Sequence, residues 1–104
     1  MNDVLLSIEQ WRVRGEQVAL ATVVRTLGSS PRAVGAKMAV SASGGIAGSV
    51  SGGCIEGAVY DACQEAMQTG EARLLHFGIA DETAWEVGLA CGGIIDVFVE
   101  PLTW

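Results

Sequence analysis

A predicted strand passes into a predicted helix within the stretch Gly48-Ser49-Val50-Ser51-Gly52-Gly53-Cys54-Ile55-Glu56-Gly57. Glycines beside a cysteine let the backbone approach a bulky ligand closely, because no Cβ stands in the way. The start of a helix adds unpaired N–H groups and a partial positive charge, which favour an anion or a thiolate. The stretch therefore predicts both a connection between two elements and a binding loop.

The residues after this turn have the spacing of an amphipathic helix. We expect that helix to run from about residue 53 to residue 69 and to end at Gly70. Its apolar face would comprise Ile55, Val59, Ala62, Cys63, Ala66 and Met67. Its outward side would comprise Glu56, Tyr60, Asp61, Gln64, Glu65 and Gln68.

The remaining apolar runs are short and rich in β-branched residues, which is typical of strands. We expect strands at residues 18–24, 37–40, 45–50, 73–77 and 94–99. The first should be buried because it is apolar almost throughout, the second and third should form a hairpin, and Pro101 should end the last. The sequence does not give the order of these strands in a sheet.

A first helix is expected to begin at Asn2 or Asp3 and to end near Gly15. Its inner face would comprise Val4, Leu5, Ile8 and Trp11. Together these elements predict an α/β or α+β fold, a single compact domain in which about two main helices pack on a mixed sheet.

Composition restricts the function classes. The chain has 104 residues, enough for one core, and a net charge of −6 with only six scattered basic residues. A binder of nucleic acid or of an anionic membrane would need a basic stripe, so we expect neither partner. No apolar run approaches the length of a spanning helix and the N-terminus lacks a signal peptide, which predicts a cytoplasmic protein. Its odd number of cysteines, three, favours free thiols.

Two of the cysteines lie beside glycines. Cys54 has two interpretations: a thiolate at a helix start that is reactive or binds a ligand, or a small apolar residue packed under a turn. Cys91, in Gly88-Leu89-Ala90-Cys91-Gly92-Gly93, has the same two interpretations. Cys63 is expected in the core. His76 is expected to be a core or edge histidine, since a zinc site with Cys54 and Cys91 would lack the usual Cys-x-x-Cys pair.

Two further segments carry polar groups. Ser29, Ser30 and Arg32 follow the first strand and could bind a phosphate or carboxylate, although from these residues alone a proline turn with a solvated arginine is the favoured explanation. Lys37 could add a second cation or could protect an edge strand. Residues 78–93 form a connection longer than most structural loops, and such loops are often functional.

Four motifs in order resemble the N-terminal domain of the XdhC/CoxI family. They are Gly28-Ser29-Ser30-Pro31-Arg32, Gly35-Ala36-Lys37-Met38, Gly48-Ser49-Val50-Ser51-Gly52-Gly53-Cys54-Ile55-Glu56 and Gly88-Leu89-Ala90-Cys91-Gly92-Gly93. The resemblance implies an accessory protein for molybdenum hydroxylases such as xanthine dehydrogenase and carbon monoxide dehydrogenase. Such proteins bind molybdenum cofactor as cargo, protect it, support its sulfuration and help to insert it into the target enzyme.

The resemblance also implies a cofactor-binding site and a set of partners. The site residues would be Ser29, Ser30, Arg32, Gly52, Gly53, Cys54, Cys91 and Gly92. We expect the first three to meet the phosphate of molybdopterin and the two cysteines to lie near its metal end, with no catalytic or metal-ligating residue.

The expected partners are a molybdenum hydroxylase, a second copy of the chain, and a separate Rossmann-domain protein. Residues 1–104 are expected to form one domain without the Rossmann-like second domain of many family members, so the chain is either a stand-alone version or has a separately encoded partner that supplies the other half. Two other functions stay open: a sulfur-transfer protein with a reactive cysteine, and a non-catalytic interaction module for such an oxidoreductase.

Overall fold

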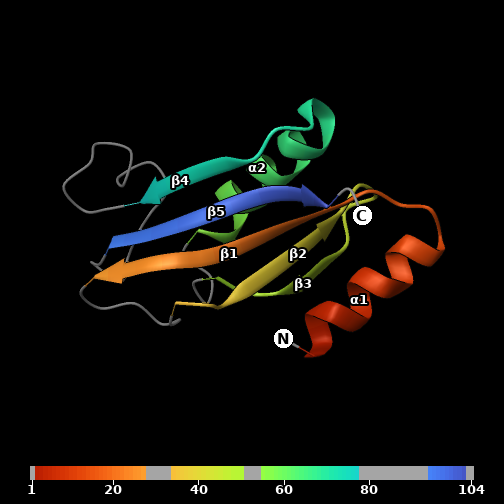
Figure 1. The fold of residues 1–104 in the computed structure, drawn as a ribbon, viewed down its shortest axis with the longest axis horizontal. Helices are drawn as coiled ribbons and strands as arrows, with labels where there is room; N and C mark the ends of the chain where they lie inside the picture. The colour runs from red at the N-terminus through yellow and green to blue at the C-terminus, as the bar shows by residue number, and fades with distance from the viewer. Residues whose placement is uncertain (1, 28–33, 51–54, 78–93, 103–104) are drawn as a thin grey trace.

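The computed structural model describes residues 2–27, 34–50, 55–77 and 94–102, which form two helices and five strands (Figure 1). In chain order they are α1 (Asn2–Val13), β1 (Val18–Leu27), β2 (Lys37–Ser41), β3 (Ile46–Gly48), α2 (Glu56–Thr69), β4 (Arg73–Phe77) and β5 (Ile94–Leu102). The strands form one sheet in the order β3-β2-β1-β5-β4.

Every pairing among the described strands is antiparallel. The expected fold class is confirmed, as a single domain with two helices and a sheet. Of the two classes named, α+β describes it, because these strands pair only in the antiparallel sense where we expected a mixed sheet. The predicted hairpin is confirmed as β2 and β3, and β5 pairs with both β1 and β4.

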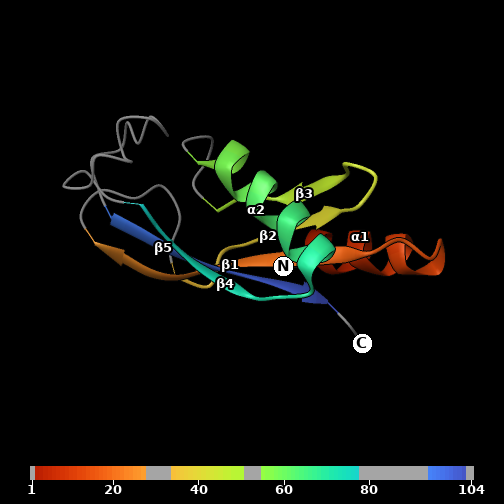
Figure 2. The same cartoon turned by 90° about the horizontal axis from the view of Figure 1, so that it is seen from above.

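The main core lies between the sheet and α2, which covers one face in Figure 2. Side chains alternate along a strand, so Ala19, Ala21 and Val23 of β1 all face the helix and are fully buried. Beyond Val23 the register with β5 shifts, and Val24 is 46 % exposed. The prediction of a buried strand therefore holds for the first part of β1 and is wrong for Val24.

A second, smaller core lies on the other face of the sheet, where α1 packs beside the β2–β3 hairpin (Figure 1). Val4 and Ile8 are buried against Val18 and Ala39, as their spacing on one face of a helix predicts. Leu5 was expected on the same face, but its position on the helix directs it outward and it is 43 % exposed.

The apolar face of α2 is confirmed in full. The helix begins at Glu56, with Ile55 as its N-cap residue, and ends at Gly70, whose left-handed φ of 76° lets its N–H bond to the carbonyl of Ala66 at 2.8 Å. Tyr60 was expected to face outward, but it is partly buried and packs against the core. Gln64, also expected outward, donates a hydrogen bond to the carbonyl of Ser41 at 3.0 Å, which ties the helix to the hairpin.

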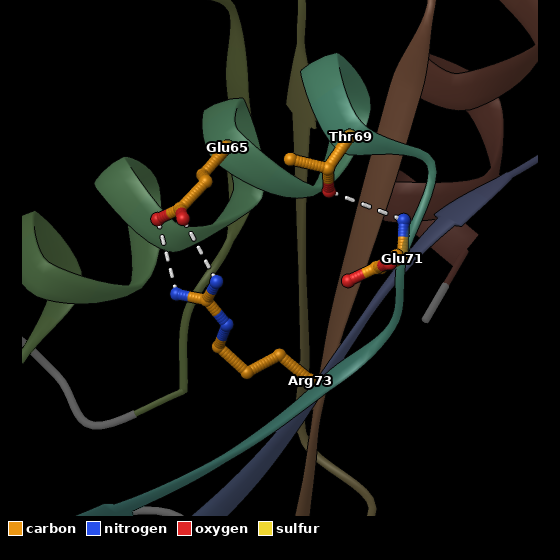
Figure 3. A network of polar contacts seen from close by, with 4 residues as sticks. All are labelled: Glu65, Thr69, Glu71 and Arg73. Carbon is orange, nitrogen blue, oxygen red and sulfur yellow. Dashed lines mark hydrogen bonds and ion pairs between the residues drawn. The ribbon is translucent and has the colours of Figure 1, made fainter.

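An ion pair joins the exposed side of α2 to the edge strand β4 (Figure 3). The Arg73 guanidinium donates from both terminal nitrogens to Glu65, at 3.0 and 2.8 Å. This pair of hydrogen bonds lowers the pKa of Glu65, and Glu65 in turn raises the pKa of Arg73. The guanidinium of Arg73 is thus engaged in a fork-to-fork contact with one carboxylate.

The last strand is longer than expected. β5 continues through Pro101 to Leu102, and Pro101 lies opposite Ala19 of β1. On its other side β4 begins at Arg73, opposite Val99, so Pro101 lies beyond the β4 pairing. Proline lacks an N–H group and is tolerated in a strand where no neighbour needs that donor, which is why the expected end at Pro101 was wrong.

Candidate functional site

The eight predicted site residues, Ser29, Ser30, Arg32, Gly52, Gly53, Cys54, Cys91 and Gly92, lie outside the described residues. They belong to three segments, residues 28–33, 51–54 and 78–93. The structure does describe the residues at which these segments join the fold. Those flanking residues define where the three segments are attached.

Two of the segments join the sheet at the same end. Leu27, the last residue before 28–33, pairs with Ile94, the first residue after 78–93. Phe77, the last residue before 78–93, pairs with Ile95 on the other side of β5. Three neighbouring strands therefore fix the attachment points of both segments within a few residues of one another.

The third segment is flanked by Val50 and Ile55, which belong to the main core together with Phe77 and Ile95. Both are buried, at 0 % and 1 % exposure. The core thus fixes both ends of segment 51–54 in the same hydrophobic cluster that contains residues next to segment 78–93.

Glu56 adds a polar connection across segment 51–54. Its Oε2 accepts a hydrogen bond from the Ser49 hydroxyl at 2.6 Å and another from the Val50 N–H at 3.1 Å. A carboxylate in the first turn of a helix also interacts favourably with the positive end of the helix dipole. The outward position expected for Glu56 is therefore wrong: it faces the strand that precedes the helix, because two donors beyond the end of that strand hold it there.

A second polar cluster lies close to the ends of β1, β4 and β5. Asp96, whose side chain is only 11 % exposed, lies opposite Arg25 on one side and opposite His76 on the other. Its Oδ2 is 3.7 Å from Arg25 Nη1, and its Oδ1 is bonded to His76 Nδ1. We call these three residues the Asp96 row.

His76 is therefore an edge histidine with a polar partner, as predicted, since β4 is one of the two edge strands of the described sheet. Arg25 and Asp96 were not singled out from the sequence. An isolated acid within the apolar run Ile94-Ile95-Asp96-Val97-Phe98-Val99 was the available signal, because a buried carboxylate requires a partner.

The two remaining candidates have structural explanations. Cys63 is completely buried, and burial raises the pKa of its thiol to about 12, so it stays neutral and packs as a small apolar residue, as expected. Lys37 lies on β2, which is flanked by β1 and β3, and its Nζ donates to the Thr22 hydroxyl at 3.2 Å. An edge-protecting role for Lys37 is therefore wrong.

The described part of the chain contains neither a metal-binding cluster nor a membrane-spanning helix. No group of three or more histidine, cysteine, aspartate or glutamate side chains within residues 2–27, 34–50, 55–77 and 94–102 is arranged to hold a metal ion. Neither α1 nor α2 is long and apolar enough to cross a membrane.

The fold defines a class of protein: an α+β domain in which one helix covers a five-stranded antiparallel sheet and two of the three predicted binding segments join that sheet at the same end. The chain belongs to the XdhC and CoxI family, whose model matches residues 11–78. This match confirms the resemblance drawn from the four motifs.

The chain is similar in sequence to proteins of Escherichia coli and Bacillus subtilis. It is 40 % identical over 81 residues to YqeB of Escherichia coli (strain K12), covering 78 % of this chain and 15 % of that protein. It is 33 % identical over 90 residues to a probable xanthine dehydrogenase subunit of Bacillus subtilis (strain 168), and 35 % identical over 89 residues to the molybdenum cofactor insertion chaperone PaoD of E. coli (strain K12). Each of these two alignments covers 85 % of this chain and 27 % of the relative.

The fold also matches a crystal structure of a xanthine dehydrogenase from Bacillus halodurans, with a TM-score of 0.79 and 28 % identity. That match covers 97 % of this chain and 31 % of the other. The chain thus spans less than a third of the length of each of these proteins.

Proposed function

We propose that this chain is an accessory protein for a molybdenum hydroxylase of the xanthine dehydrogenase or carbon monoxide dehydrogenase type. In this role it binds molybdenum cofactor as cargo and assists its sulfuration or its insertion into the target enzyme. The family match over residues 11–78 carries this proposal. The similarity to a molybdenum cofactor insertion chaperone supports it further.

The arrangement of the described residues supports a single site. The pairing of Leu27 with Ile94 brings one attachment point of segment 28–33 close to one of segment 78–93, and the flanks of segment 51–54 belong to the core that contains Phe77 and Ile95. We propose that the three segments contribute the eight predicted residues to one cofactor site. Serine hydroxyls and a guanidinium suit a phosphate, and glycine backbone at a helix start suits an anion.

The proposed partners come from the same family membership. They are the molybdenum hydroxylase that receives the cofactor, a second copy of this chain, and a Rossmann-domain protein, all in the cytoplasm.

Cofactor binding tests the proposal directly. Purified protein is titrated with molybdenum cofactor under anaerobic, reducing conditions, and wild type is compared with Arg32→Ala, Cys54→Ser and Cys91→Ser. The matched controls are Arg14→Ala, an exposed arginine just after α1, and Cys63→Ala, a cysteine in the core. We expect saturable binding that the first three changes weaken and that the two controls leave intact in folded protein.

Two results would favour other functions. Loss of sulfur transfer in Cys54→Ser or Cys91→Ser with cofactor binding retained would favour a persulfide carrier. Absence of binding by wild type, together with capture of the target enzyme, would contradict the chaperone role and favour a non-catalytic interaction module.

A further inference from the structure

The outward side of α1 carries apolar side chains that the fold does not bury. Leu6 is 57 % exposed and Val13 is 88 % exposed, although Val4 and Ile8 of the same helix are buried. Leu6 and Val13 are seven residues apart, which is two turns of a helix, so they lie on one line along its surface. Apolar side chains on both sides of a helix indicate that a second surface packs on it.

Two polar residues lie between these apolar side chains. Glu9 and Gln10 are exposed and, together with Leu6 and Val13, line one shallow groove on the outward side of the helix. A carboxylate only accepts hydrogen bonds, whereas an amide also donates them. The groove therefore contains an acceptor, a donor and two apolar contacts within about 11 Å along the helix axis.

The order of these four residues is self-complementary. Two copies of the helix are placed antiparallel about a two-fold axis, with Leu6 of one copy opposite Val13 of the partner subunit. Glu9 then lies level with Gln10 of the partner subunit, and the axis repeats each contact, which gives two apolar pairs and two carboxylate–amide pairs. A parallel pair would instead bring the two Glu9 carboxylates together, where they repel one another.

The position of α1 leaves its outward side open to a second copy. The helix lies at the margin of the molecule, beside the β2–β3 hairpin (Figure 1). It packs on the sheet through Val4 and Ile8, which belong to the second core. A partner can therefore bind to the outward side without disturbing the side chains that hold α1 on the sheet.

We propose that α1 forms an antiparallel, two-fold helix pair with α1 of a second copy of this chain. The pair is short, since 12 residues span about 18 Å, and it buries less than the ~1,600 Å² of a standard interface. We therefore expect a reversible dimer with a dissociation constant of about 10 μM to 1 mM. This interface deepens the proposed function, on which it rests for the second copy as partner, and it needs no bound cofactor.

Sedimentation equilibrium of the purified chain, without cofactor and over a range of concentrations that spans this dissociation constant, tests the helix pair. Leu6→Gln and Val13→Gln should each raise the dissociation constant about tenfold or more, because the axis repeats every lost apolar contact. Leu74→Gln is the matched control. Leu74 is 60 % exposed but lies on β4, so this change should alter the dissociation constant by less than about twofold.

The charge at position 10 tests the antiparallel direction. Gln10→Lys places an ammonium group level with Glu9 of the partner subunit and should tighten the dimer, whereas Gln10→Glu places a carboxylate there and should weaken it. Each effect should be about two- to tenfold, because exposed ion pairs are weak and the axis repeats them. Gln68→Lys and Gln68→Glu, at an exposed position of α2, make the same changes in net charge and should have smaller effects.

Three results would overturn the proposal: a chain that stays monomeric throughout, a dimer that Leu6→Gln and Val13→Gln leave unchanged, and a dimer on which Gln10→Lys and Gln10→Glu have the same effect. Circular dichroism checks that each variant is folded, as the exposure of these side chains predicts. A monomer that binds molybdenum cofactor would refute the helix pair and leave the proposed function in place. A dimer with the expected responses that binds no cofactor would do the reverse.

Discussion

Replacing Glu56 by alanine tests whether one carboxylate holds the two ends of segment 51–54 together. The side chain accepts hydrogen bonds from the Ser49 hydroxyl and from the Val50 N–H. Val50 is completely buried, so its N–H cannot turn to water when the acceptor is removed. Ser49 is partly exposed, and its hydroxyl can find water instead.

The size of the effect follows from this difference. A buried donor left without an acceptor costs about 1–3 kcal/mol, whereas a hydroxyl that returns to water costs little. Loss of the favourable interaction with the helix dipole adds about 0.3–1 kcal/mol. We therefore expect Glu56→Ala to lower the free energy of unfolding by about 2 kcal/mol, or the melting temperature by about 10 °C in a domain of this size. Glu56→Gln should lose about half as much, because it keeps an acceptor oxygen.

The assay is urea denaturation followed by circular dichroism, together with hydrogen exchange at the Val50 amide. Glu65→Ala is the matched control, a glutamate on the same helix whose partner Arg73 is exposed to solvent, and it should have a much smaller effect. If Glu56→Ala proves no more destabilising than Glu65→Ala, or if exchange at Val50 is unchanged, the carboxylate does not hold this junction.

Three further predictions concern stability. The thiol of Cys63 has a pKa of about 12 in the native protein and about 9.0 in the unfolded chain, so the free energy of unfolding should fall as pH rises between these values. Urea denaturation at a series of pH values should show this fall in wild type and not in Cys63→Ala. The ion pair with Arg73 lowers the pKa of Glu65, so ionised Glu65 stabilises the fold above the ordinary pKa of glutamate, and this stabilisation is lost as pH falls through the lowered pKa. Wild type should therefore lose a little thermal stability in acid that Glu65→Gln does not lose. Gly48→Ala should destabilise more than Gly70→Ala in thermal melts. Both glycines have a positive φ, which alone costs about 1–2 kcal/mol, but of the two only Gly48 would place an added Cβ against backbone, the carbonyl of Lys37.

Local structure was predictable wherever the signal is periodic. The apolar positions of α2 recur with helical spacing, and Ile55, Val59 and Cys63 are buried as a result. The hairpin followed from two short apolar runs around a turn. These inferences need only neighbouring residues, which is why they succeeded.

What failed depends on partners far along the chain. Pro101 continues β5 because the β4 pairing stops short of it, and the sequence gives no strand order from which to know this. Val24 is exposed because alternation from the buried Val23 turns it to the face opposite α2, at the point where the register between β1 and β5 shifts. Glu56 has an outward position by helical spacing, and only the end of the preceding strand explains why it faces inward.

The Asp96 row shows why the same limit applies to candidate sites. Arg25, His76 and Asp96 are separated widely in sequence, and only strand pairing places them opposite one another. Both partners of Asp96 are more than half exposed, and contacts of this kind contribute only about 0–1 kcal/mol to stability. An apolar residue at position 96 would match its neighbours in β5 and would need no partner. The apolar run around Asp96 therefore predicts the strand but not the row, because the partners of the acid are set by the pairing of β5 with β1 and with β4.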